Sequence, residues 1–165
     1  MGIEPTGAAE GTSHWKQYVI ELWDADGNTL TILERRVPWF TPLTGPEPAP
    51  QFESDPPFHP YMLDLSEDEG GRIWVLVRVP DANWRSGIRR GDTPDGPGGL
   101  IMVDPDKVYG TIIEVINPTD GIVLASQRLD NNLHGFSDNT HVHGYRENAQ
   151  GVPTIGVLRM DLDCS

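Results

Sequence analysis

The chain has 165 residues, and its 18 glycines and 15 prolines make one residue in five unfavourable to regular helices. Its formal net charge of −13 repels nucleic-acid backbones and anionic membrane surfaces, so we expect neither nucleic acid nor a membrane as a partner. No apolar run approaches the roughly 18 residues that span a bilayer, and the composition predicts a soluble, mostly-β chain.

Residues 1–16 carry no strand or helix pattern and are expected to form a flexible segment before a single domain over 17–163. Within the domain, short apolar stretches bounded by Gly, Asp and Asn turns predict strands. Nine strands are expected, over 18–24, 28–37, 61–65, 72–79, 111–116, 122–128, 133–136, 140–147 and 154–162. A proline-rich connection over 38–60 and a long Gly/Pro-rich loop insertion over 81–110 interrupt them.

The turn over 24–28 has oxygen side chains at alternate positions, as calcium loops do. An EF-hand loop starting at Asp24 requires Glu at its twelfth position, where this chain has Arg35. A hairpin turn that uses Asp and Gly for positive-φ positions explains the same residues. We therefore interpret 24–28 as a hairpin turn.

Distant segments of the chain are similar to one another. Residues 18–30 match 111–124 once one residue is inserted in the turn, and 154–162 resemble the first strand of both. The predicted strands then fall into groups of two, four and three, and four-stranded units repeated in series are typical of β-propeller blades. The strand over 72–79 is apolar on both faces, which predicts a position between two layers.

Four segments carry a resemblance to a known family. Gly-Arg-Ile-Trp-Val-Leu at 71–76, the hairpin at 113–124, Gly-Phe-Ser-Asp at 135–138 and Val-His-Gly-Tyr-Arg-Glu at 142–147 resemble the six-bladed β-propellers of the NHL and YWTD-like bacterial group. The resemblance implies an all-β fold of propeller blades. A complete six-bladed ring is longer than this chain, and nine strands also suit a β-sandwich of jelly-roll type, which is the alternative.

A partial propeller has to be completed by oligomerisation or by a partner chain, because its terminal blades each expose an apolar face. Those faces are expected to include some of Ile20, Leu22, Ile155, Val157 and Leu158. Three copies contributing two blades each would close a ring of six. We expect a homo-oligomer with the strand over 154–162 near the subunit boundary.

An aromatic and guanidinium group lies on the insertion over 81–110. Trp84, Arg85, Arg89 and Arg90 have the chemistry that binds carboxylates, sugars or a partner protein. A flexible basic loop that balances an acidic body is the alternative. Trp39, at the start of the proline-rich connection, is expected either to line the same binding face or to anchor the loop to the core.

Two histidines are spaced for a shared metal ion. His141 and His143 are two residues apart on a predicted strand and project to one face, with His134 or His59 as a third ligand. Some six-bladed lyases in the wider family bind zinc through inward-facing histidines, so the resemblance also implies a zinc site here. Packing between blades is the alternative. Cys164 is the only cysteine, so no intramolecular disulfide forms.

The sequence predicts a binding or protein-interaction module built from propeller blades, with a small molecule, a glycan or a protein as its ligand. The alternative is a metal-dependent hydrolase or lyase on a propeller scaffold, with zinc or calcium as the cofactor. We nominate no catalytic residue, because the sequence has no nucleophile elbow, zinc-protease motif, phosphate loop or dinucleotide fingerprint. The compartment is left open, since an extracellular or periplasmic location requires only the removal of a signal peptide.

Overall fold

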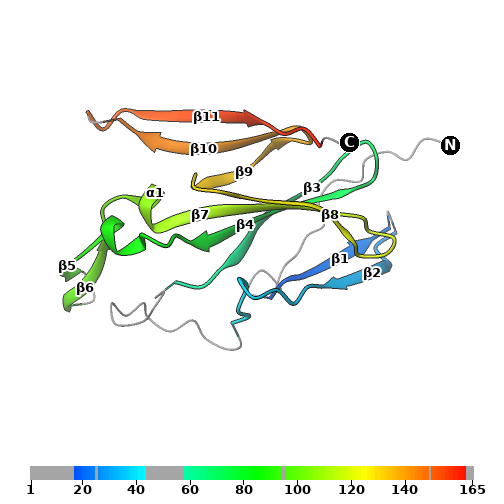
Figure 1. The fold of residues 1–165 in the computed structure, drawn as a ribbon, viewed down its shortest axis with the longest axis horizontal. Helices are drawn as coiled ribbons and strands as arrows, with labels where there is room; N and C mark the ends of the chain where they lie inside the picture. The colour runs from blue at the N-terminus through cyan, green and yellow to red at the C-terminus, as the bar shows by residue number, and fades with distance from the viewer. Residues whose placement is uncertain (1–16, 25, 44–57, 94–95, 149, 163–165) are drawn as a thin grey trace.

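The computed structural model describes residues 17–24, 26–43, 58–93, 96–148 and 150–162, which form eleven strands and two short helices (Figure 1). The strands are β1 (Val19–Trp23), β2 (Thr29–Glu34), β3 (Tyr61–Glu67), β4 (Ile73–Pro80), β5 (Ile88–Thr93), β6 (Gly96–Met102), β7 (Tyr109–Ile116), β8 (Val123–Leu129), β9 (Leu133–Asp138), β10 (His141–Glu147) and β11 (Pro153–Arg159). The helices are η1 (Trp84–Gly87), a turn of 3-10 helix, and α1 (Pro105–Val108). Neither has the length and apolar character needed to cross a membrane.

The prediction of an all-β fold is confirmed, and each of the nine predicted strands is present within a few residues of its expected position. The expected flexible segment over 1–16 lies outside the described residues, as does the 44–57 part of the proline-rich connection. The described sheets are all antiparallel and small, with two, three or four strands.

The insertion over 81–110 was expected to be a long loop, and this prediction was wrong. It contains η1, the hairpin β5–β6 and α1 in succession. Glycines hid the hairpin from pattern analysis, because they weaken the strand signal. They also make the hairpin possible: Gly98 has a φ of 80°, and a Cβ on Gly99 would lie 2.5 Å from the Thr93 side chain.

The central sheet has the strand order β3-β4-β7-β8, and the insertion leaves it after β4 and returns at β7. Its two central strands, β4 and β7, pair in a continuous antiparallel register, with Ile73 opposite Ile116 and Pro80 opposite Tyr109. The hairpin β1–β2 lies on one side of this sheet, and the three-stranded sheet β11-β10-β9 lies on the other (Figure 1).

Two hydrophobic cores separate these layers. Alternate residues of β4 point to opposite faces, so Val75 and Val77 enter the core shared with β1–β2, while Trp74 and Leu76 enter the core shared with β9 and β10. All four side chains are buried. The prediction that the strand over 72–79 lies between two layers is confirmed. The side chains on both faces of β4 are removed from water on folding, and this burial of apolar surface holds the three layers together.

Polar contacts also join the third layer to the central sheet. The Asp64 carboxylate on β3 accepts the backbone N–H of Phe136 on β9 at 2.8 Å. The buried Thr111 hydroxyl on β7 donates to the Asn131 carbonyl at 2.8 Å and accepts the Leu133 N–H at 3.0 Å. These bonds satisfy backbone groups that would otherwise be buried without partners.

The interpretation of 24–28 as a hairpin turn is confirmed by the pairing of β1 with β2. The Asp24 carboxylate accepts the backbone N–H groups of Asp26 and Asn28 at 2.9 and 2.8 Å. Gly27 has a φ of 82°, a left-handed conformation that glycine adopts without steric cost.

Candidate functional site

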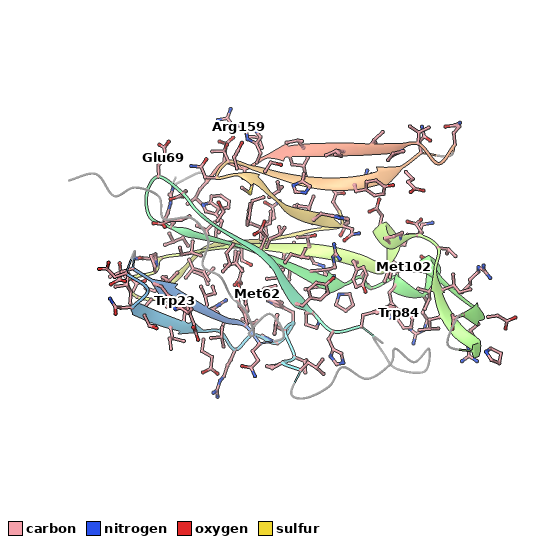
Figure 2. All side chains as sticks on the ribbon, turned by 180° about the vertical axis from the view of Figure 1, so that it is seen from behind. Trp23, Met62, Glu69, Trp84, Met102 and Arg159 are labelled. Carbon is pink, nitrogen blue, oxygen red and sulfur yellow. The ribbon has the colours of Figure 1, made fainter. Side chains whose placement is uncertain are left out.

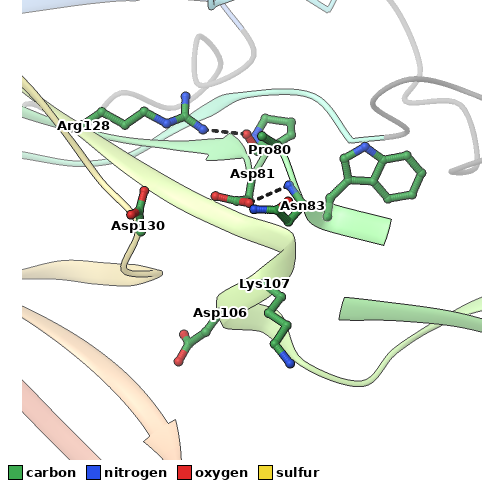
Figure 3. A pocket seen from close by; sticks show the side chains of 9 residues that line it. Pro80, Asp81, Asn83, Asp106, Lys107, Arg128 and Asp130 are labelled. Carbon is green, nitrogen blue, oxygen red and sulfur yellow. Dashed lines mark hydrogen bonds between the residues drawn. The ribbon is translucent and has the colours of Figure 1, made fainter. Parts of the chain in front are cut away.

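An open, polar cleft lies where β4 ends, beside η1, α1 and the end of β8 (Figure 3). Its volume is about 640 Å³. The lining residues are Pro80, Asp81, Ala82, Asn83, Trp84, Asp106, Lys107, Arg128 and Asp130. Chain segments far apart in sequence thus meet at the end of the central sheet where the insertion leaves and returns.

Several charged groups of the cleft already have partners. Arg128 donates to the Pro80 carbonyl at 2.9 Å, the Asp81 carboxylate accepts the Asn83 N–H at 2.7 Å, and Arg146 reaches Asp106 at 3.1 Å. The lining holds the carboxylates of Asp81, Asp106 and Asp130 and the cations of Lys107 and Arg128, so the cleft offers both signs of charge to water. Such a surface can hold a small polar molecule, but it lacks the desolvation that sharpens catalytic electrostatics.

The predicted aromatic and guanidinium group is dispersed. Trp84 is only 2% exposed and packs in a small core with Ile88 and Val108, and the Arg85 guanidinium stacks over its ring at 4.3 Å. Arg89 and Arg90 are exposed, but as neighbours on β5 they project to opposite faces. The Trp84 indole is thus a core side chain that packs edge-on against Phe58, and a binding role for Arg85, Arg89 and Arg90 stays a prediction.

Trp39 is half-buried and belongs to the core beneath β1–β2. Its ring lies 5.7 Å from that of Tyr18 and 6.2 Å from that of Phe40. It therefore anchors the chain after β2 to the core, which was one of the two roles expected of it. It lies in a different core from Trp84, so the two tryptophans do not line one binding face.

The paired histidines contact separate partners. His141 Nδ1 lies 3.0 Å from the Asp138 carboxylate, and His143 Nδ1 lies 3.2 Å from the Ser137 hydroxyl. Among the described residues, no three His, Cys, Asp or Glu side chains gather closely enough to hold a metal ion. A metal role for His141 and His143, with His134 or His59, stays a prediction. Burial, followed by the charges of Arg78 and His143, lowers the pKa of His134.

Asp138 fixes the turn between β9 and β10. Its carboxylate accepts the Thr140 backbone N–H at 2.7 Å, the Thr140 hydroxyl at 2.8 Å and a contact from His141. These bonds, the backbone one first, lower the pKa of Asp138 from 3.8 to about 2. Because bonding favours the ionised form, the contribution of this turn to stability is present above pH 3.8 and is lost as pH falls through about 2.

A carbon-13 NMR titration of the carboxyl groups is expected to give Asp138 a midpoint near pH 2. In the matched variant Thr140→Val, the backbone donor remains and the hydroxyl is lost, so the midpoint should rise part of the way toward 3.8. A midpoint of 3.8 in the unmodified chain would show that the turn does not bind the carboxylate.

Exposed apolar side chains of the third layer gather on the outer face of β10 and β11. Their register has no bulge, and Val142 points into the core, so the odd-numbered residues of both strands share the outer face. Tyr145, Ile155 and Val157 lie there with exposures of 41, 71 and 55%. We call these three exposed side chains, Tyr145, Ile155 and Val157, the C-terminal patch.

A second apolar surface lies on the opposite side of the layers. Trp23, Leu30 and Ile32 of hairpin β1–β2 are 45, 67 and 57% exposed. Figure 2 shows Trp23 and Arg159, the last residue of β11, on opposite sides of the molecule. Of the five residues from which exposed terminal faces were expected, Ile155, Val157 and Leu158 are exposed, whereas Ile20 is 1% exposed and Leu22 packs against the same core. That these are faces of terminal blades stays a prediction.

In hairpin β1–β2 the side chains alternate between the core and the outer face, and this alternation separates the buried residues from the exposed ones. Ile20 is opposite Leu33, and both point to the core, so Ile32 and Leu30 on the neighbouring positions point outward. Tyr145, which no sequence pattern singled out, lies beside Ile155 on the neighbouring strand. No protein-family model, curated protein or solved structure matches the chain.

Proposed function

We propose that the chain is a non-enzymatic protein-interaction module built from β-propeller blades, and that the C-terminal patch is its binding surface. The observation that carries the proposal is the exposure of Tyr145, Ile155 and Val157 side by side on one sheet. Contiguous apolar side chains of this kind on a soluble chain mark sites of association. An aromatic ring beside branched aliphatic residues is also the composition of binding hot spots.

The blade assignment is supported by the order of the strands. A complete antiparallel unit, β3-β4-β7-β8, is flanked face to face by smaller sheets, as blades are in a propeller. The hairpin β1–β2 is similar in sequence to β7–β8, and β9–β10–β11 follow the order of the first three strands of that unit. The resemblance to NHL and YWTD-like propellers is part of this proposal.

The binding role is preferred over the metal-dependent hydrolase or lyase because of where the side chains lie. A shared ion requires His141 and His143 to turn toward a common point, whereas their Nδ1 atoms contact Asp138 and Ser137 respectively. The polar cleft is too open to exclude water from a reacting group. The C-terminal patch needs no rearrangement to bind an apolar partner.

Immobilised at low concentration, the chain is expected to select peptides from a random display library. Ile155→Glu places a carboxylate in the C-terminal patch and should lower the affinity for the selected peptides by at least about tenfold, because the charge must be desolvated on binding. Leu124→Glu is the matched control, since it puts the same charge on an exposed aliphatic side chain of β8, outside the C-terminal patch. The proposal fails if no peptide is selected, or if Leu124→Glu weakens binding as much as Ile155→Glu.

A further inference from the structure

The free edge of β11 presents backbone groups in a defined pattern. Met160 N donates to Thr140 O, and Asn148 N donates to Val152 O, so even-numbered residues of this strand bond to β10. Odd-numbered residues therefore direct their N–H and C=O groups away from β10. In the described part of the chain β11 pairs with β10 alone. The outward groups are the N–H and C=O of Ile155, Val157 and Arg159 and the C=O of Pro153.

The middle of this edge, from Thr154 to Leu158, has neither the proline nor the charged side chains that normally prevent strand pairing. All seven residues of β11 are exposed, and none except the terminal Arg159 is charged. A free edge that is long and apolar is a template for another strand. The sequence of β11 is similar to that of β7, which pairs with β4 on one side and with β8 on the other. The position that β8 occupies beside β7 has no counterpart beside β11 among the described residues.

The sequence of β11 is self-complementary about Gly156. When two copies pair antiparallel with Gly156 at the centre, Ile155 of each lies opposite Val157 of the other and continues the C-terminal patch. The outward groups of these residues then form four hydrogen bonds by the antiparallel rule, and Arg159 N–H to Pro153 C=O adds two more, about six in all. Proline falls at the strand end, where its missing N–H removes no bond from the middle of the ladder.

Charge also favours this register. Glu147 pairs with Pro153, and in the paired arrangement Arg159 of the second copy lies on the other side of that proline. The three residues share the outer face, and neighbouring strands are about 4.8 Å apart, so the long Arg159 and Glu147 side chains can meet across the small ring. Residues 152–159 contain no acidic group, which matters for two chains that each carry a net charge of −13.

We propose that a second copy of this chain binds at β11 by two-fold antiparallel pairing and forms a continuous six-stranded sheet. The proposal rests on the C-terminal patch being an interaction surface, and it names the partner. It is an isologous contact that closes with two copies. It therefore differs from the head-to-tail ring of three that blade counting suggests.

Light scattering on the full chain is expected to give twice 18.3 kDa at high concentration and 18.3 kDa on dilution. Val157→Pro removes an N–H that points away from β10, so it spares the β10–β11 ladder and should weaken the dimer by about 10- to 100-fold. Val157→Thr, which keeps the N–H and the branched shape, is the control and should retain the dimer. A mass of three copies, or one of 18.3 kDa at every concentration, overturns the proposal.

Cross-linking tests the register. In a Cys164→Ser background, Gly156→Cys should oxidise to a covalent dimer, because a non-hydrogen-bonded pair at the two-fold axis brings the two Cα atoms to about 4.5 Å. A Cβ on Gly156 meets no atom within 4 Å, so the substitution fits. Thr154→Cys alone should not cross-link, but mixed with Leu158→Cys it should. If the chain selects peptides through Ile155 but never dimerises, only the two-fold pairing is overturned. If a dimer linked through Gly156→Cys forms but the chain selects no peptide, only the general binding role is overturned.

Discussion

Replacing Glu114 by alanine is expected to lower the free energy of unfolding by about 3–5 kcal/mol, because it leaves the half-buried Arg35 guanidinium without its counter-charge and the buried Tyr18 hydroxyl without its acceptor. Glu114 lies on β7 and is 2% exposed. Its carboxylate accepts a hydrogen bond from the Tyr18 hydroxyl at 2.5 Å and from Arg35 at 3.0 Å. Urea unfolding followed by tryptophan fluorescence measures the loss.

A pair of tyrosine variants separates burial from simple hydrogen bonding. Tyr18→Phe removes one of the donors to Glu114 and should cost about 1–3 kcal/mol, since a buried acceptor loses one of its partners. Burial, then the bond to the Glu114 carboxylate, raises the pKa of Tyr18, as expected of a hydroxyl held in its neutral form. Tyr145 makes the same kind of bond to Glu147 at 2.6 Å on the surface, so Tyr145→Phe should change stability by less than about 0.5 kcal/mol. Equal costs for the two variants would contradict the account of Glu114.

Replacing Trp84 by alanine is expected to cost about 3–5 kcal/mol, the usual range for a large aromatic side chain in a core. Its indole is buried against Ile88 and Val108, and it joins η1 to the hairpin β5–β6 and to α1. Hydrogen exchange should rise first in β5, β6 and α1, because these elements share the small core. Urea unfolding gives the overall loss.

Arg85→Ala is the control for that experiment. It removes the guanidinium that stacks over the Trp84 ring but leaves the indole in place, so the expected cost is below about 1 kcal/mol. If Trp84→Ala left the stability unchanged but weakened the binding of a ligand, the binding role predicted from the sequence would be right and the core role wrong.

Strand positions were predictable where apolar side chains alternate or run continuously. The segment over 72–79 is apolar on both faces, and only burial between two layers removes all of those side chains from water. The hairpin β5–β6 escaped detection because Gly96, Gly98 and Gly99 of β6 have no side chain and leave little apolar pattern to recognise.

Side-chain partners were less predictable, because they come from distant parts of the chain. Tyr18 is 96 residues from Glu114, and no local pattern joins them. The burial of Trp84 depends on Phe58, which lies before the central sheet. That 154–162 lies at a sheet edge was a prediction from counting blades, and in the described part of the chain β11 pairs with β10 alone.

The measurement that tests the central claim most directly is residue-resolved amide hydrogen exchange in β11 at low and high protein concentration. The account predicts that Thr154, Gly156 and Leu158, which bond to β10, are protected at both concentrations. The outward amides of Ile155, Val157 and Arg159 should exchange rapidly in dilute solution and become protected on concentration. Outward amides that exchange at the same rate at both concentrations would contradict the pairing of β11 with a second copy.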